Sequence, residues 1–173
     1  MKNNIVLIGF MGTGKSTVGM RLAQKLKREF VDMDREIENI NGMTVSQIFR
    51  RYGEIRFRSE ESLMAKKLSK KQNLVIATGG GFVLLKENIE TLRENGIIIC
   101  LQADPQDIYA RVSRKKGTRP LLKKNLQIED IENLLAQREA FYACADYRVN
   151  TSGKDLDAVI NEIVSLVKNH PSA

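Results

Sequence analysis

The chain has 173 residues, of which 42% are hydrophobic and 28% charged, the size and composition of one folded domain; this excludes a disordered or collagen-like protein. No apolar run approaches the ~20 residues of a membrane-spanning helix, so we expect a cytoplasmic protein without a membrane partner. The single histidine lies close to the C-terminus and the two cysteines form no Cys-x-x-Cys pair, which excludes histidine bases, histidine-ligated metals and zinc sites, and leaves a carboxylate as the general base.

Short apolar runs alternate with amphipathic stretches along the whole chain. In the first part we expect a strand at 5–8, a helix at 15–29, a strand at 30–31, and helices at 34–41, 45–52 and 54–71. In the second part we expect strands at 74–77, 97–101 and 147–149, and helices at 86–95, 105–113, 128–145 and 156–168. Short apolar strands that alternate with helices indicate an α/β fold, with a parallel sheet covered by helices on both faces.

The first predicted strand leads into a glycine-rich segment. Residues 9–16 have the sequence GFMGTGKS, which matches G-x-x-x-x-G-K-[ST] and lies between a predicted strand and a predicted helix. Glycines let backbone N–H groups approach phosphate oxygens, Lys15 reaches the β- and γ-phosphates, and the Ser16 hydroxyl is a ligand for Mg²⁺. A dinucleotide site would need G-x-G-x-x-G instead. The motif predicts that the chain binds a nucleoside triphosphate, but it does not identify the phosphate acceptor.

Three further features follow predicted strands or lie on the long helix. Asp32 and Asp34 follow the second predicted strand. One carboxylate could serve the metal site and the other the attacking nucleophile, or both could belong to the acidic N-terminus of a helix. Their spacing leaves both interpretations open. Arg58 and Glu61 are three residues apart on one helix face. They form either an ordinary ion pair or a site in which Glu61 holds Arg58 in place to bind a ligand carboxylate. Three consecutive glycines at 79–81 favour close approach of the backbone to a small ligand over a flexible loop.

Together these motifs resemble the shikimate kinase family, small P-loop phosphotransferases of the nucleoside-monophosphate-kinase type. The matching parts occur in family order over almost the whole chain: residues 9–17, Asp32 with Asp34, residues 45–49, residues 53–61, residues 78–81, residues 119–122, and Arg138 with Tyr142. The resemblance implies one three-layer αβα P-loop kinase domain, with a five-stranded parallel sheet in the order 2-3-1-4-5. It also implies a shikimate-binding segment at about 32–61 and a mobile lid at about 112–124.

The implied reaction is the transfer of the γ-phosphate of ATP, with Mg²⁺, to the 3-hydroxyl of shikimate, giving shikimate 3-phosphate and ADP. The resemblance implies a monomer and these site residues. Catalytic roles fall to Lys15, Asp34 and Arg119, with Asp34 orienting or deprotonating the attacking hydroxyl. ATP would be bound by Gly12, Thr13, Gly14, Lys15, Ser16, Thr17, Arg111, which lies against the adenine, and Arg119. Shikimate would be bound by Asp34, Arg58, Gly79, Gly80, Gly81 and Arg138, with Phe49, Phe57 and Leu121 as walls. Magnesium would be held by Ser16 and, through water, by Asp32.

A departure from the family pattern and an alternative enzyme remain open. Ala140 stands where the family often has proline, and another small-metabolite kinase such as a gluconate kinase would also carry two acids after its second strand. A nucleic-acid-binding ATPase or a GTPase-like switch is disfavoured, because the chain has no N-K-x-D motif and no basic–aromatic array. The net charge of +7 equals the seven lysines and arginines at 111–124, where there is no acid. We therefore expect no nucleic-acid partner, and a local positive patch that attracts ATP.

Overall fold

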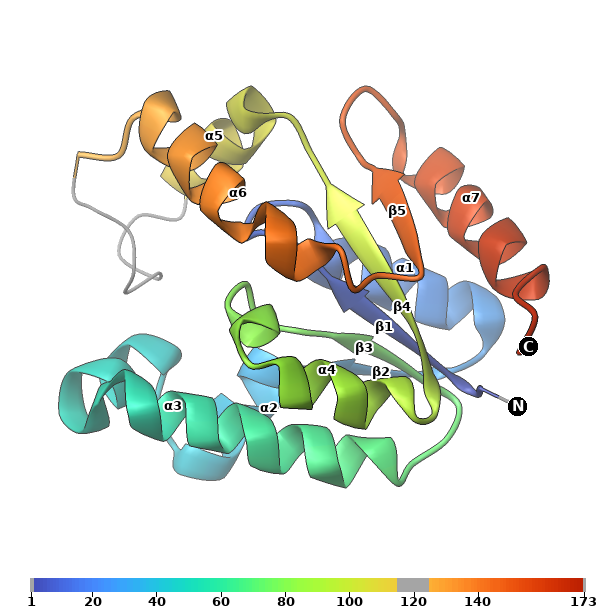
Figure 1. The fold of residues 1–173 in the computed structure, drawn as a ribbon, viewed down its shortest axis with the longest axis horizontal. Helices are drawn as coiled ribbons and strands as arrows, with labels where there is room; N and C mark the ends of the chain where they lie inside the picture. Colours follow the sequence, from blue (N-terminus) through green and yellow to red (C-terminus); the bar gives the residue numbers. More distant parts are fainter. Residues whose placement is uncertain (1, 115–124, 173) are drawn as a thin grey trace.

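The computed structural model of the chain describes residues 2–114 and 125–172 (Figure 1). Five parallel strands form one sheet in the order β2-β3-β1-β4-β5, which confirms the predicted order. The strands are β1 (Asn4–Ile8), β2 (Glu29–Asp32), β3 (Leu74–Ala77), β4 (Gly96–Gln102) and β5 (Tyr147–Asn150). Each begins and ends within one residue of its predicted limits, because short apolar runs between polar turns mark buried parallel strands clearly.

Helices cover both faces of this sheet, as predicted (Figure 1). They are α1 (Lys15–Leu26), α2 (Met33–Asn41), α3 (Val45–Ser69), the short 3₁₀ helix η1 (Phe82–Leu84), α4 (Lys86–Arg93), α5 (Pro105–Ser113), α6 (Ile128–Tyr142) and α7 (Leu156–Lys168). Alternate residues of β1 point to opposite faces: Ile5 and Leu7 pack with α1 and α7, whereas Val6 and Ile8 pack with the helices of the other face. Because all five strands are parallel, their carboxyl ends meet at one edge of the sheet, where the ligand is expected.

Several predicted helix limits differ from the structure. The helices expected at 86–95 and 128–145 end earlier, at Arg93 and Tyr142, and two further differences lie in the first part of the chain. The helix expected at 15–29 ends at Leu26, because Lys27 adopts a left-handed conformation with φ of 53° and turns the chain toward β2. The helices expected at 45–52 and 54–71 form α3, which is interrupted at Gly53, where φ is 83° and ψ is 172°. The predicted start of α3 is confirmed: Thr44 and Gln47 form a capping box.

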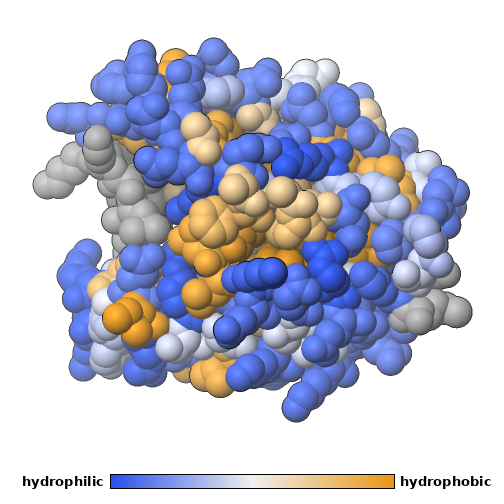
Figure 2. Space-filling view, viewed as in Figure 1, coloured by the Kyte–Doolittle hydropathy of each residue, from blue (hydrophilic) through white to orange (hydrophobic). Residues whose placement is uncertain are grey.

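The predicted lid at 112–124 falls mostly outside the described residues. Val112 and Ser113 are the last residues of α5, whereas Arg119 and Leu121 lie in the part that the structure does not describe. Within the described residues, no helix is long and apolar enough to cross a bilayer. Figure 2 shows a mostly hydrophilic surface with a few hydrophobic side chains exposed. The large exposed ones come from several elements: Met20, Ile40, Tyr52, Ile55, Leu63, Leu85 and Phe141.

Candidate functional site

The turn between β1 and α1, which we call the phosphate cradle (residues 9–16), has the backbone that its glycines predict. Gly9, Gly12 and Gly14 have φ of 147°, 78° and 96°, a region that side chains with a Cβ rarely adopt. A Cβ on Gly9 would also lie 2.4 Å from the Leu101 carbonyl oxygen, at the end of β4. Gly14 is the N-cap of α1, so the cradle opens onto the N-terminus of a helix, which favours anions.

Lys15 folds back over the cradle. Its side chain is only 8% exposed, and Nζ donates to the carbonyls of Gly9 and Phe10 at 2.6 and 2.9 Å. The Thr13 hydroxyl donates to the same Phe10 carbonyl at 2.7 Å. The lysine charge is thus held at the phosphate cradle by neutral acceptors, which a triphosphate can replace with charge-assisted bonds.

Ser16, in the first turn of α1, and Asp32, the last residue of β2, come together. Ser16 Oγ donates to Asp32 Oδ2 at 2.7 Å, and Asp32 Oδ1 accepts from the backbone N–H of Arg35 as the N-cap of α2. The two interpretations left open for Asp32, a helix cap and a metal-site residue, are therefore compatible. One hydroxyl and one carboxylate beside a triphosphate site form the sparse oxygen donor set that suits Mg²⁺, which keeps several waters and takes phosphate oxygens as ligands. Among the described residues, no group of three His, Cys, Asp or Glu side chains is placed to hold a metal by itself.

A second group of residues, which we call the acceptor cluster, surrounds the three glycines after β3. It consists of Asp34, Arg58, Glu61, Arg138 and residues 79–81. A Cβ on Gly79 would lie 2.7 Å from Asp34 Oδ1 and 3.1 Å from Glu61 Oε2, so the two carboxylates approach each other across this glycine. The structure thus brings side chains from α2, α3 and α6, which the sequence places far apart, against the glycine backbone after β3.

Arg58 is held on both sides by acids. Nη1 donates to Glu61 Oε1 at 2.6 Å, and Nη2 donates to Glu54 Oε1 at 3.2 Å. A Cβ on Gly81 would lie 2.4 Å from Nη2, so the guanidinium rests directly on the backbone of this glycine. The ring centroids of Phe49 and Phe57 lie 5.0 Å apart beside it. The ion pair between Arg58 and Glu61 therefore exists, and it also orients the arginine toward the glycines.

Glu61 is the most deeply buried charged side chain of the acceptor cluster, with 1% exposure. Burial raises the pKa of its carboxyl from 4.5 to about 7, against the opposing attraction of Arg58, and the nearby Asp34 carboxylate raises it further. Among the described residues, Glu61 Oε2 has no hydrogen-bond partner. Burial therefore favours the protonated form of this carboxyl and opposes its ion pair with Arg58.

Arg138 and Arg111 connect the later helices to the two groups. Arg138, on α6, is 9% exposed, donates to the Gly80 carbonyl at 2.7 Å and stacks over the Phe10 ring at 5.7 Å. Arg111, on α5, donates to the Gly12 carbonyl at 2.9 Å, so it lies at the cradle itself. Arg138 therefore lies where the phosphate cradle and the acceptor cluster meet.

Thr151, which follows β5 and is 8% exposed, is not among the site residues that the motifs predict. Its hydroxyl donates to the Thr13 carbonyl of the phosphate cradle at 3.0 Å, although 138 positions separate the two residues. No motif marks this threonine. Its only hint in the sequence is its position at the carboxyl end of a predicted strand, the edge at which ligands of such sheets bind.

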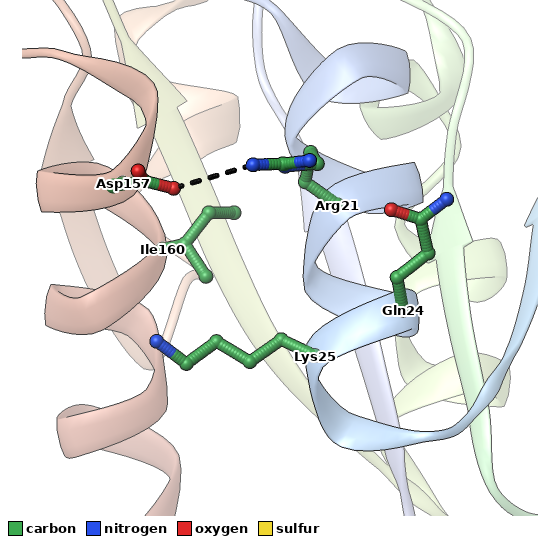
Figure 3. Close-up of a pocket in the computed structure, with 5 residues that line it drawn as sticks. All are labelled: Arg21, Gln24, Lys25, Asp157 and Ile160. Atoms are coloured by element: carbon green, nitrogen blue, oxygen red, sulfur yellow. Dashed lines mark ion pairs between the residues drawn. The ribbon is translucent and has the colours of Figure 1, made fainter.

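A hollow lies between α1 and α7 (Figure 3). It is lined by Arg21, Gln24, Lys25, Asp157 and Ile160, from α1 and α7. Arg21 and Asp157 form an ion pair across it at 3.6 Å, and both side chains are well exposed. Among the described residues, no predicted site residue lines this hollow.

A family model and two sequence relatives of this chain carry the same description. A family model described as shikimate kinase matches residues 11–168. The chain is 54% identical to a shikimate kinase of Pelotomaculum thermopropionicum, over 96% of this chain and 96% of that protein. It is 49% identical to a shikimate kinase of Desulforudis audaxviator, over 95% of this chain and 86% of that protein.

Solved structures agree with this assignment. Shikimate kinase from Acinetobacter baumannii in complex with shikimate matches with a TM-score of 0.92 and 35% identity, over 100% of this chain and 97% of that one. A gluconokinase from Sinorhizobium meliloti matches with a TM-score of 0.60 but only 16% identity, over 96% and 94% of the two chains, which shows the shared fold alone. The gluconate kinase alternative thus has only a distant match, and the chain belongs to the shikimate kinase family of ATP-dependent kinases.

Proposed function

We propose that the chain phosphorylates the 3-hydroxyl of shikimate with ATP, using the phosphate cradle for the triphosphate and the acceptor cluster for shikimate. The observation that carries the proposal is the convergence of Asp34, Arg58 and Arg138 on the glycines at 79–81, beside the cradle. A carboxylate that can accept a proton and two guanidiniums that can bind a carboxylate match the two functional ends of a hydroxy acid.

On the triphosphate side, backbone N–H groups of the cradle bind phosphate oxygens and Lys15 exchanges its carbonyl partners for them. Thr17, in the first turn of α1, and Arg111 belong to the same side. Arg119, from the segment at 112–124, supplies a further positive charge as the phosphoryl group transfers, and this segment keeps water away. Mg²⁺, held by Ser16 and through water by Asp32, offsets negative charge on the phosphates when bound.

On the acceptor side, Arg58 and Arg138 bind the planar carboxylate of shikimate, for which a guanidinium gives paired hydrogen bonds. Asp34 orients the 3-hydroxyl and accepts its proton as the hydroxyl oxygen forms its bond to the γ-phosphorus. The bond from that phosphorus to the bridging oxygen breaks at the same centre, and ADP leaves with the electron pair. Phe49, Phe57 and Leu121 form the apolar walls around the ring of the acceptor.

The whole chain acts in this proposal as one P-loop kinase domain and as a monomer in the cytoplasm. The support for a single domain is that Arg138 bonds to the Gly80 carbonyl of the acceptor cluster and lies over the Phe10 ring of the phosphate cradle. Residues 32–61 supply most of the acceptor side, and residues 112–124 supply the lid.

The deciding experiment measures ADP release with ATP, Mg²⁺ and a panel of shikimate, gluconate and nucleoside monophosphates. Turnover with shikimate and none with the other acceptors is the expected result. Turnover with gluconate but not shikimate would assign the acceptor cluster to a different hydroxy acid, and turnover with a nucleotide would contradict the proposed role of the two arginines.

A further inference from the structure

The outward-facing carbonyls of the phosphate cradle are held by side chains, and two of the donors come from outside the motif. Arg111 Nη1 donates to the Gly12 carbonyl at 2.9 Å, and Thr151 Oγ1 donates to the Thr13 carbonyl at 3.0 Å. Arg111 already has an expected role beside the nucleotide. Thr151 has none, yet its hydroxyl reaches the part of the cradle from which α1 begins.

The bond from Thr151 determines where the next N–H group points. The carbonyl of Thr13 and the N–H of Gly14 belong to the same planar trans peptide, so they point in opposite directions. A bond that holds this carbonyl toward Thr151 therefore directs the Gly14 N–H to the opposite side, where a P-loop binds phosphate oxygens. Gly14 has φ of 96° and lacks a Cβ, so its own sterics restrict this peptide little.

Thr151 is itself held firmly by the sheet. Its backbone N–H donates to the Gln102 carbonyl at 2.8 Å, which continues the pairing of β5 with β4 beyond Asn150. Its hydroxyl lies 3.0 Å from the same Gln102 carbonyl and 3.0 Å from the Thr13 carbonyl, so one proton serves two acceptors. Because the backbone bond does not need the hydroxyl, the link to the cradle can be removed while the residue stays in place.

We propose that Thr151 is a positioning residue for the triphosphate: its hydroxyl orients the peptide between Thr13 and Gly14 so that the N–H faces the phosphates. Thr151→Val keeps the β-branched shape and removes the donor. From the usual contribution of one hydrogen bond, we expect triphosphate binding to weaken about 3- to 10-fold. Thr151→Ser keeps the hydroxyl and restores binding.

The test measures the KM for ATP and the inhibition constant of inorganic tripolyphosphate competing with ATP, at constant free Mg²⁺. Turnover of shikimate by the unaltered chain is measured first, so a failure of the proposed function is recognised separately. In Thr151→Val both constants rise by the same factor, while the KM for shikimate stays unchanged. Tripolyphosphate has no nucleoside, so an equal rise locates the effect at the phosphates.

Thr78→Val is the matched control, because the buried Thr78 hydroxyl makes the same kind of bond, to the Leu7 carbonyl at 3.0 Å, outside the cradle. We expect Thr78→Val to lower Tm by about as much as Thr151→Val does, without changing the inhibition constant of tripolyphosphate. Thr151→Ala is a second variant for the case that the methyl group replacing the hydroxyl in valine does not fit, and it should show the same loss of binding. Unchanged inhibition in both Thr151 variants, a rise in the KM for ATP alone, or an equal rise in Thr78→Val would each overturn the proposal.

Discussion

The phosphate cradle and the acceptor cluster are built in different ways, although they meet at one edge of the sheet. The cradle is a continuous turn whose shape depends on backbone conformation at three glycines and on donors to its carbonyls. The acceptor cluster combines charged side chains from three helices around the glycines at 79–81, held by ion pairs. In the proposed function, phosphate binding therefore depends mainly on backbone geometry and acceptor binding mainly on buried charge, so perturbations should separate the two.

Asp34→Asn should have the largest effect of the changes considered. The amide keeps the size of the side chain but cannot accept the proton of the attacking hydroxyl, so we expect kcat to fall about 10²- to 10⁴-fold. ATP binding, measured by calorimetry in the absence of shikimate, should be nearly unchanged, because the cradle keeps its donors. Retained turnover would show that Asp34 does not accept the proton in this reaction.

Arg58→Ala should weaken acceptor binding while sparing the cradle. Removal of the partly buried Arg58 guanidinium leaves Glu61 without its main partner and the shikimate carboxylate with one arginine, so we expect the KM for shikimate to rise about 100-fold. The KM for ATP should change little. Arg56→Ala is a matched control, because Arg56 pairs with Glu60 on the same helix without touching the cluster. Equal effects of the two changes would indicate general damage to α3.

The pH dependence of stability should report the buried carboxyl of Glu61. Because burial raises its pKa in the folded chain from 4.5 to about 7, the folded state binds this proton more tightly than the unfolded state does. The free energy of unfolding should therefore fall as pH rises from about 4.5 to about 7, by up to about 3 kcal/mol, and level off above. Urea denaturation of the parent chain and Glu61→Gln measures this difference. Parallel pH curves for the two proteins would contradict the raised pKa.

Gly79→Ala should have the smallest of these effects. A Cβ there would lie 2.7 Å from Asp34 Oδ1 and force the carboxylate to move, a close-packing strain of about 1–2 kcal/mol, so we expect kcat/KM for shikimate to fall about tenfold. Gly153→Ala is a control for backbone effects, since its Cβ would meet nothing within 4 Å and its φ is 70°. In thermal unfolding, Gly153→Ala should lose stability, but its kcat/KM for shikimate should stay unchanged.

The cradle was predictable because its chemistry lies in eight consecutive residues. Glycines at fixed offsets, with Lys15 and Ser16, predict both the turn and the class of ligand, and the structure shows the predicted backbone. The acceptor cluster was predicted less directly. The spacing of Arg58 and Glu61 indicated a pair, but their place beside Asp34 and the glycines at 79–81 followed only from resemblance to the family and from the fold.

The sequence by itself determined the five strands, most helix limits, the phosphate cradle and the family, since each depends on local periodicity or on motifs. Tertiary structure alone decided that Arg138 would bond to the Gly80 carbonyl, Arg111 to the Gly12 carbonyl and Thr151 to the Thr13 carbonyl. It also decided how far burial would raise the pKa of Glu61. Hydrogen bonds and desolvation depend on which groups meet in space, and these groups are brought together by the pairing of the parallel strands and the packing of helices against the sheet.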